Sequence, residues 1–233
     1  MTFRERDVLF LDETGFHRLV YSDWGLENAP QTVICIHGLT GTGRDFDRLA
    51  ERLTADGSRR LLCPDMPGRG RSDWMPNATG YGFPTYLNAC TALIAASNAR
   101  SVDWIGTSMG GIIGMLMAAQ PGTPVRRLIL NDVGAFIPKA ALQRIGSYVG
   151  KDPRFDSLPG VEAYLREVHA PFGPMTDDDW RHMTQIAARP VEEGGYALHY
   201  DPAIGTSFQD PNIADADLWP VWHGISCPTL LIR

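Results

Sequence analysis

Apolar residues gather in short runs along the chain, and stretches with helical spacing lie between several of them. The runs cover residues 33–36, 61–63, 102–105, 128–130 and 229–232, and each is bounded by Gly, Pro or Asp. Runs of this length are typical of strands that are buried on both faces of a sheet. Apolar residues recur with helical spacing over 46–53 and 86–96, and residues 109–119 are apolar on almost every side. This alternation predicts an α/β fold with a mostly parallel, doubly wound sheet.

Two segments depart from this alternation. Val8–Leu11 and Arg18–Tyr21 lie on either side of a turn at Gly15 and predict an antiparallel hairpin at one edge of the sheet. After Asp132 the next clear strand begins only at Thr229, and the residues between them show helical stretches and several prolines. A structureless loop of that length is unusual in a compact domain, so a mainly helical cap is expected. We therefore divide the chain into a core over 1–133, a cap insertion over 134–217 and a return to the core over 218–233.

Composition narrows the class of protein. The 233 residues are 44% apolar and 21% charged, and the net charge of −6 argues against nucleic acid as a partner. The four cysteines show no metal-binding or disulfide spacing, and we expect neither a metal nor another cofactor. No secretion signal and no apolar stretch long enough for a membrane helix is seen, which predicts a soluble, cytoplasmic protein without a membrane partner.

The strongest chemical signal is Gly106-Thr107-Ser108-Met109-Gly110-Gly111, which fits the pattern G-x-S-x-G. It lies between a predicted strand and a predicted helix, where a sharp turn exposes the serine hydroxyl above the sheet. Gly106 and Gly110 fit this reading because larger side chains would collide at such a turn. Ser108 is therefore the predicted nucleophile.

A second glycine-rich segment, Ile36-His37-Gly38-Leu39-Thr40-Gly41, follows the strand over 33–36. Attack by Ser108 on a carbonyl group would create an oxyanion, which needs preorganised N–H donors. The backbone N–H groups of Leu39 and Met109 are the predicted donors. His37 and Gly38 are assigned to the substrate-binding loop, with the His37 ring expected to fix that loop. A phosphate-binding loop is disfavoured because the Lys-Ser/Thr ending is missing.

Together with Asp65-Met66-Pro67-Gly68-Arg69-Gly70-Arg71-Ser72-Asp73, these motifs resemble the α/β-hydrolase fold family of the serine type. The resemblance is to bacterial esterase- and lipase-like hydrolases and implies hydrolysis of esters or related acyl groups. It also implies the order Ser, acid, His for the catalytic triad. In relatives the acid and the histidine commonly follow the strand that corresponds to 229–232, so the chain looks truncated, without the C-terminal strand and helix.

The sequence supports weaker predictions for several other residues. Asp132, at the end of the strand over 128–130, is an alternative catalytic acid, although a carboxylate that accepts backbone hydrogen bonds is favoured there. Trp74 is a predicted substrate-binding residue at the mouth of the cleft, with ordinary packing as the alternative. Arg69, Arg71 and Asp73 are interpreted as ion pairs that stabilise a turn. His169, His182, His199 and His223 follow Ser108 in the chain, and none is a good candidate for the general base.

The sequence therefore predicts a serine hydrolase that takes a small-molecule acyl substrate and forms an acyl-enzyme on Ser108. Its base and acid are expected beyond Arg233. The alternative is a catalytically incomplete fragment or pseudo-enzyme that at most binds a small ligand. A homo-oligomer stays open.

Overall fold

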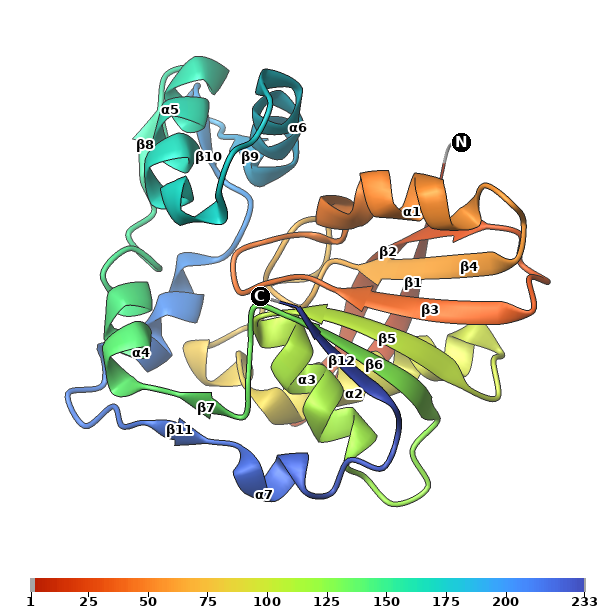
Figure 1. The fold of residues 1–233 in the computed structure, drawn as a ribbon. Helices are drawn as coiled ribbons and strands as arrows, with labels where there is room; N and C mark the ends of the chain where they lie inside the picture. The colour runs from red at the N-terminus through yellow and green to blue at the C-terminus, as the bar shows by residue number, and fades with distance from the viewer. Residues whose placement is uncertain (1–2, 233) are drawn as a thin grey trace.

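The computed structural model describes residues 3–232, and its centre is a seven-stranded sheet (Figure 1). The strand order is β1-β2-β4-β3-β5-β6-β12. The strands are β1 (Arg4–Asp12), β2 (Gly15–Gly25), β3 (Gln31–Ile36), β4 (Arg59–Pro64), β5 (Val102–Thr107), β6 (Val125–Asn131) and β12 (Thr229–Ile232). Neighbouring strands from β4 to β12 run parallel, while β1, β2 and β4 pair antiparallel. The predicted α/β class with its mostly parallel sheet is confirmed.

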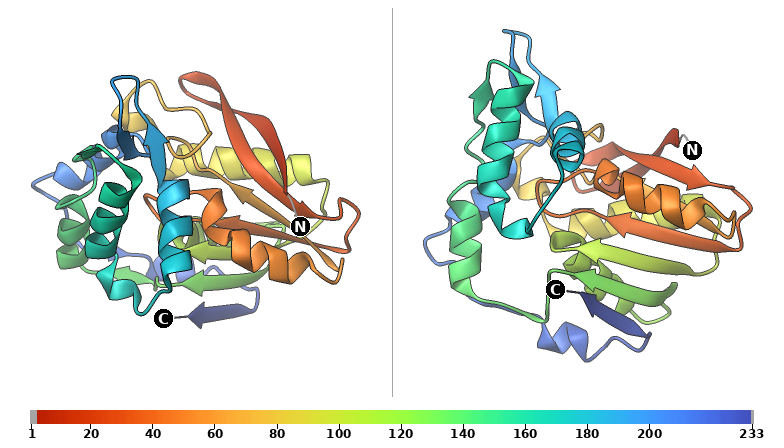
Figure 2. Two further views of the ribbon diagram at one scale, coloured as in Figure 1. Left: turned by 90° about the horizontal axis from the view of Figure 1, so that it is seen from above. Right: turned by 45° about the horizontal axis from the view of Figure 1, so that its top comes forward.

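Helices cover both faces of this sheet (Figures 1 and 2). They are α1 (Asp47–Thr54), preceded by the 3-10 turn η1 (Gly43–Phe46), α2 (Phe83–Ser97), preceded by η2 (Ala78–Gly80), and α3 (Met109–Ala118). Alternate residues of β3 serve the two faces, because Val33 and Cys35 join the apolar cluster beside Ala50 of α1, whereas Ile34 and Ile36 join the larger cluster on the opposite side. Burial on both faces explains why the parallel strands read as unbroken apolar runs.

The residues between β6 and β12 form a separate layer beside the carboxyl ends of the parallel strands (Figure 1). Its elements are β7 (Phe136–Ile137), α4 (Lys139–Gly146), β8 (Arg154–Phe155), α5 (Leu158–Val168), η3 (Ala170–Phe172), α6 (Asp177–Ala187), β9 (Ala188–Pro190), β10 (Tyr196–Leu198), η4 (Pro202–Gln209) and β11 (Ala216–Asp217). Two small sheets, β8-β10-β9 and β11-β7, lie among the helices and are too short for a sequence pattern to reveal. We call residues 134–217 the cap. The short helix α7 (Trp219–Trp222) leads back to β12.

The cap helix α6 begins at a reciprocal side-chain cap. Thr176 accepts a hydrogen bond from the N–H of Asp179, whose carboxylate in turn accepts one from the N–H of Thr176. This reciprocal cap satisfies donors that a helix start otherwise leaves unpaired. The negative charges of the three aspartates in the first turn also interact favourably with the positive end of the helix dipole. Among residues 3–232, no helix has the length and apolar character needed to cross a membrane.

Candidate active site

Ser108 lies in a strained turn between β5 and α3. Its φ of +48° is in the region that residues with a side chain seldom adopt. Such strain persists only where the surroundings impose it, and it is concentrated at functional sites. Here the turn leaves Ser108 at the carboxyl edge of the sheet, at the N-terminus of α3.

The tight turn requires glycine on both sides of Ser108. A Cβ atom on Gly106 would lie 2.3 Å from the carbonyl oxygen of Gly110, and one on Gly110 would lie 2.1 Å from that of Ile36. Both neighbours are backbone atoms, which cannot rotate away as a side chain would. The G-x-S-x-G spacing therefore has a steric cause in this fold.

The loop after β3 lies directly against Ser108. A Cβ atom on Gly38 would sit 3.9 Å from the Cβ of Ser108, so the two segments are in van der Waals range. The N–H of Met109 opens α3 and has no partner within the helix. Within residues 3–232, no hydrogen bond to a protein group engages the N–H of Leu39. The structure thus brings together Ser108, Gly38 and both predicted N–H donors, while their catalytic roles stay predictions.

The His37 ring fixes this loop from inside the protein. It is fully buried, its Nδ1–H donates to the carbonyl of Gly38 at 2.6 Å, and its Nε2 accepts from the N–H of Met66 at 2.9 Å. Burial lowers the pKa of His37 from 6.5 to about 4, because the interior disfavours the charged ring. A neutral ring with both nitrogens occupied is a structural element of the loop.

The loop of residues 65–73, which we call the Asp65 loop, is held in place by the buried carboxylate of Asp65. Asp65 is buried and accepts from the N–H of Gly43 at 2.8 Å and from the Nε of Arg71 at 2.7 Å. Arg71 also pairs with Glu5, and Asp73 pairs with Arg18.

The ion-pair interpretation is therefore right for Arg71 and Asp73 but wrong for Arg69. Arg69 is fully buried, and no carboxylate within residues 3–232 lies at ion-pair distance from it. Its guanidinium binds backbone carbonyls and aromatic groups instead. A charge pattern alone cannot reveal this, and the only local signal is that Arg69 stands between Gly68 and Gly70, both at positive φ.

Trp74 and Asp132, the two remaining predicted site residues, are not joined to Ser108 by any hydrogen bond in the described chain. Trp74 is 41% exposed, and the guanidinium of Arg189 in β9 lies over its ring at 5.2 Å, which links core and cap. Asp132 follows β6 with a φ of +54°, and its N–H donates to the carbonyl of Ile232. The histidine ion pairs found over 3–232 involve Asp12 and Asp47, not Asp132.

The histidines beyond Ser108 have contacts elsewhere. The ring of His169 packs against Phe172, and that of His223 against Trp219. His182 contacts the carbonyl of Arg44, and burial lowers the pKa of both His169 and His199. In the described chain, none of these rings is hydrogen-bonded to Ser108.

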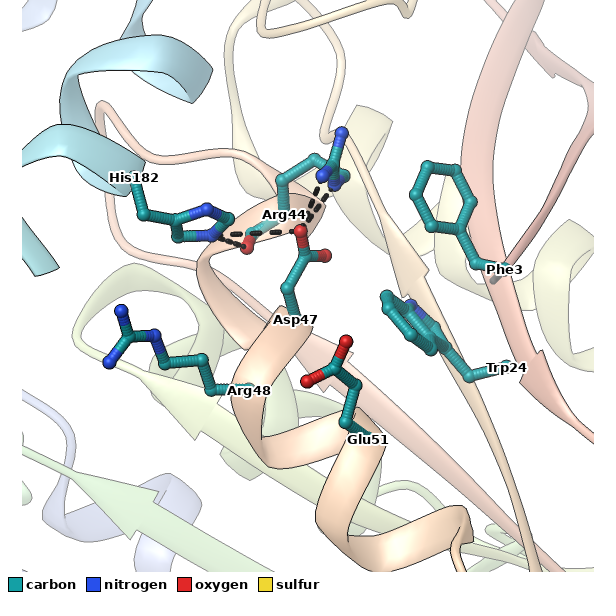
Figure 3. A pocket seen from close by; sticks show the side chains of 7 residues that line it. All are labelled: Phe3, Trp24, Arg44, Asp47, Arg48, Glu51 and His182. Carbon is teal, nitrogen blue, oxygen red and sulfur yellow. Dashed lines mark hydrogen bonds and ion pairs between the residues drawn. The ribbon is translucent and has the colours of Figure 1, made fainter. Parts of the chain in front are cut away.

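A hollow of about 560 Å³ lies where α6 of the cap meets α1 and η1 of the core (Figure 3). Its lining residues are Phe3, Trp24, Arg44, Asp47, Arg48, Glu51 and His182, and none of them is a predicted site residue. Asp47 accepts from Arg44 at 2.6 Å and lies 3.6 Å from His182. The hollow therefore marks a polar contact between cap and core. Across residues 3–232, no group of three or more His, Cys, Asp or Glu side chains could hold a metal ion.

Comparison with known proteins agrees with this architecture. A family model described as alpha/beta hydrolase fold matches residues 31–204. The chain is 41% identical to the 3-hydroxybutyrate-oligomer hydrolase of Cupriavidus necator over 234 residues, covering 97% of this chain and 79% of that protein.

Solved structures give the same result. A putative hydrolase from Rickettsia typhi superposes with a TM-score of 0.91 at 31% identity, covering 100% of this chain and 82% of that one. An alpha/beta hydrolase from Novosphingobium aromaticivorans gives 0.84 at 30% identity, with coverage of 100% and 82%. The sheet order, the turn at Ser108 and these matches together place the chain in the α/β-hydrolase family, and the protein is a hydrolase.

Proposed function

We propose that this hydrolase is a serine esterase that works through an acyl-enzyme on Ser108. The observation that carries the proposal is the strained Ser108 turn, packed against Gly38 with the N–H groups of Leu39 and Met109 beside it. A tetrahedral intermediate needs a nucleophile and N–H donors at one point, and preorganised donors of this kind supply much of the catalysis in acyl transfer.

In the proposed reaction, the Oγ of Ser108 forms a bond to the ester carbonyl carbon while its proton passes to a general base. The carbonyl oxygen gains negative charge and is held by the N–H groups of Leu39 and Met109. Collapse of the intermediate expels the alcohol, which takes up the proton, and leaves the acyl group on Ser108. Water then attacks the acyl-enzyme by the same steps, releases the acid and restores the hydroxyl group.

We propose that the general base is a histidine other than His37, one that follows the serine and the acid along the chain. The contacts of the His37 ring support this, since one nitrogen donates to Gly38 and the other accepts from Met66. Such a ring cannot take a proton from Ser108 without losing a loop contact.

For the substrate we propose a short linear ester of hydroxy acids. The likeness to the 3-hydroxybutyrate-oligomer hydrolase, at 41% identity over 97% of this chain, supports this class. Each ester bond of such an oligomer offers one carbonyl to Ser108, and its cleavage releases as the alcohol the hydroxy acid or shorter oligomer on the oxygen side of that bond.

The test combines covalent labelling with turnover by the full-length protein. A fluorophosphonate should modify Ser108 alone, as found by peptide mass mapping, and Ser108→Ala should abolish the labelling. The same protein should release 3-hydroxybutyrate from its dimer and trimer. Labelling at another residue would refute the assigned nucleophile. Labelling at Ser108 with p-nitrophenyl acetate turnover but no oligomer cleavage would refute only the substrate class.

A further inference from the structure

One guanidinium contacts both residues that carry the predicted oxyanion donors. Arg69 in the Asp65 loop donates from Nε to the carbonyl of Leu39 at 2.8 Å, and its Nη2 lies 3.5 Å from the Sδ of Met109. Its Nη1 donates to the carbonyl of Pro67 at 2.6 Å and to the hydroxyl of Tyr86 at 2.8 Å. Arg69 thus bridges the loop after β3 and the start of α3, which are far apart in the sequence.

The environment of Arg69 is unusual for a charged residue. Its side chain is fully buried, and the groups that solvate it are carbonyls, a hydroxyl, a thioether and the rings of Tyr81 and Tyr86, at 5.9 and 5.2 Å. A buried charge is costly unless it is well hydrogen-bonded. Three directed hydrogen bonds from a planar, rigid group hold the surrounding loops in one arrangement.

The bond to Leu39 completes the fixation of the predicted donor. The N–H of Leu39 shares a planar trans peptide with the carbonyl of Gly38, so the two point in opposite directions. That carbonyl accepts from His37 at 2.6 Å and from the N–H of Gly41 at 3.2 Å, which fixes this first plane. The next peptide plane contains the carbonyl of Leu39, and Arg69 holds this plane by donating to that carbonyl. With both flanking planes held, little freedom is left for the Leu39 N–H.

We propose that Arg69 is a positioning residue for the oxyanion hole: it holds Leu39 and Met109 in register, so that both N–H groups point at one site before substrate binds. The inference rests on the proposed serine-esterase function and adds to it a residue outside the triad. Its effect is expected on the transition state, because misaligned donors lose most where the charge on the oxygen is greatest.

The experiment compares Arg69→Met, Arg69→Lys and, as a matched control, Arg71→Met in the full-length protein. Arg71 belongs to the same loop but binds Asp65 and Glu5 and contacts neither Leu39 nor Met109. The readouts are kcat and KM for p-nitrophenyl acetate, and the inhibition constant of a boronic acid that forms a tetrahedral adduct on Ser108. Thermal unfolding shows which variants are folded at the assay temperature.

For Arg69→Met we expect kcat to fall about tenfold to a hundredfold with KM nearly unchanged. The inhibition constant of the boronic acid should rise by a similar factor. Arg69→Lys keeps the charge but not the planar fork, so it should recover part of the loss. Arg71→Met should lower the unfolding temperature and leave kcat near the wild-type value. A purely structural Arg69 would give the Arg71 pattern instead.

The outcomes separate this inference from the proposed function. If the wild type neither hydrolyses the ester nor is labelled on Ser108, the proposed function fails. If the wild type is active and a folded Arg69→Met keeps its kcat and boronate affinity, only the role of Arg69 is refuted. If Arg69→Met does not fold, Arg69→Lys decides: a lower kcat with proportionally weaker boronate binding supports the role, and wild-type values for both overturn it.

Discussion

The backbone N–H of Ser108 donates a 2.9 Å hydrogen bond to the carbonyl of Asn131, the last residue of β6. This bond fastens the turn at the end of β5 to the neighbouring strand through backbone atoms alone. A positive φ at a residue with a side chain costs on the order of 1–3 kcal/mol and needs such external support. The strain at Ser108 is therefore imposed by the sheet and does not depend on the hydroxyl group.

Replacement of Ser108 by alanine should separate fold from catalysis. Since the backbone bond to Asn131 is unaffected, Ser108→Ala should keep the wild-type unfolding temperature. Loss of the nucleophile should lower kcat by about a thousandfold or more. Thermal unfolding tests the first of these expectations, and ester hydrolysis by the same protein tests the second. Ser101→Ala, at an exposed position before β5, serves as the control and should retain full activity. Most of the wild-type rate in Ser108→Ala would remove this serine from the mechanism.

The sequence predicts those parts of the molecule that are determined locally. The apolar runs correspond to β3, β4, β5, β6 and β12, and the hairpin predicted around Gly15 is found as β1 and β2. The sequence predicts Ser108 as the nucleophile because glycines at two fixed positions are a steric requirement of its turn. By contrast, the contacts of Arg69 depend on how three distant segments meet, and no local pattern encodes that meeting. The small sheets of the cap pair only two or three residues per strand, which is too short for periodicity to appear.

Gly110, two residues after Ser108, should be intolerant of even a methyl group. In Gly110→Ala the new Cβ would meet the carbonyl oxygen of Ile36 at 2.1 Å, so the helix or the strand must shift. Overpacking of this kind lowers the free energy of unfolding by about 1–3 kcal/mol. We expect a loss near the top of this range, because the backbone atoms that the methyl group meets cannot rotate away. Urea unfolding measures the loss. Gly134→Ala is the matched control, because no atom lies within 4 Å of its Cβ, and it should be nearly neutral. Equal stabilities for both variants would contradict the steric argument.

His37 should make the fold sensitive to mild acid. Its pKa is lowered from 6.5 to about 4 in the folded protein, so between these values the unfolded chain binds a proton that the folded chain does not. The neutral His37 ring therefore contributes roughly 3 kcal/mol to the free energy of unfolding at a pH above 6.5, the pKa of the ring in the unfolded chain. This contribution is lost as the pH falls toward about 4. The free energy of unfolding of the wild type should therefore decrease more between neutral pH and pH 4 than that of His37→Gln. Parallel pH profiles for the two proteins would show that the ring is not held neutral.

His182 should help to hold the cap against the core. Its Nε2–H donates to the carbonyl of Arg44 at 3.3 Å and lies 3.6 Å from Asp47 (Figure 3). Arg48 of α1 also pairs with Asp179 of α6. A hydrogen bond of this kind is worth about 0.5–1.5 kcal/mol, so His182→Ala should speed amide exchange in α6 by about threefold to tenfold.

Arg181→Ala provides the control for this last prediction. Arg181 lies on the same helix, is exposed, and pairs with Asp178 within α6, so its removal leaves the contact between cap and core intact. Exchange in α6 should then stay close to the wild-type rate, and exchange in β3 and β5 should be unchanged in both variants, because those strands are buried in the core. If His182→Ala and Arg181→Ala accelerate α6 equally, the effect comes from the helix itself and not from its contact with Arg44 and Asp47. If neither does, the contact contributes nothing measurable to holding the cap against the core.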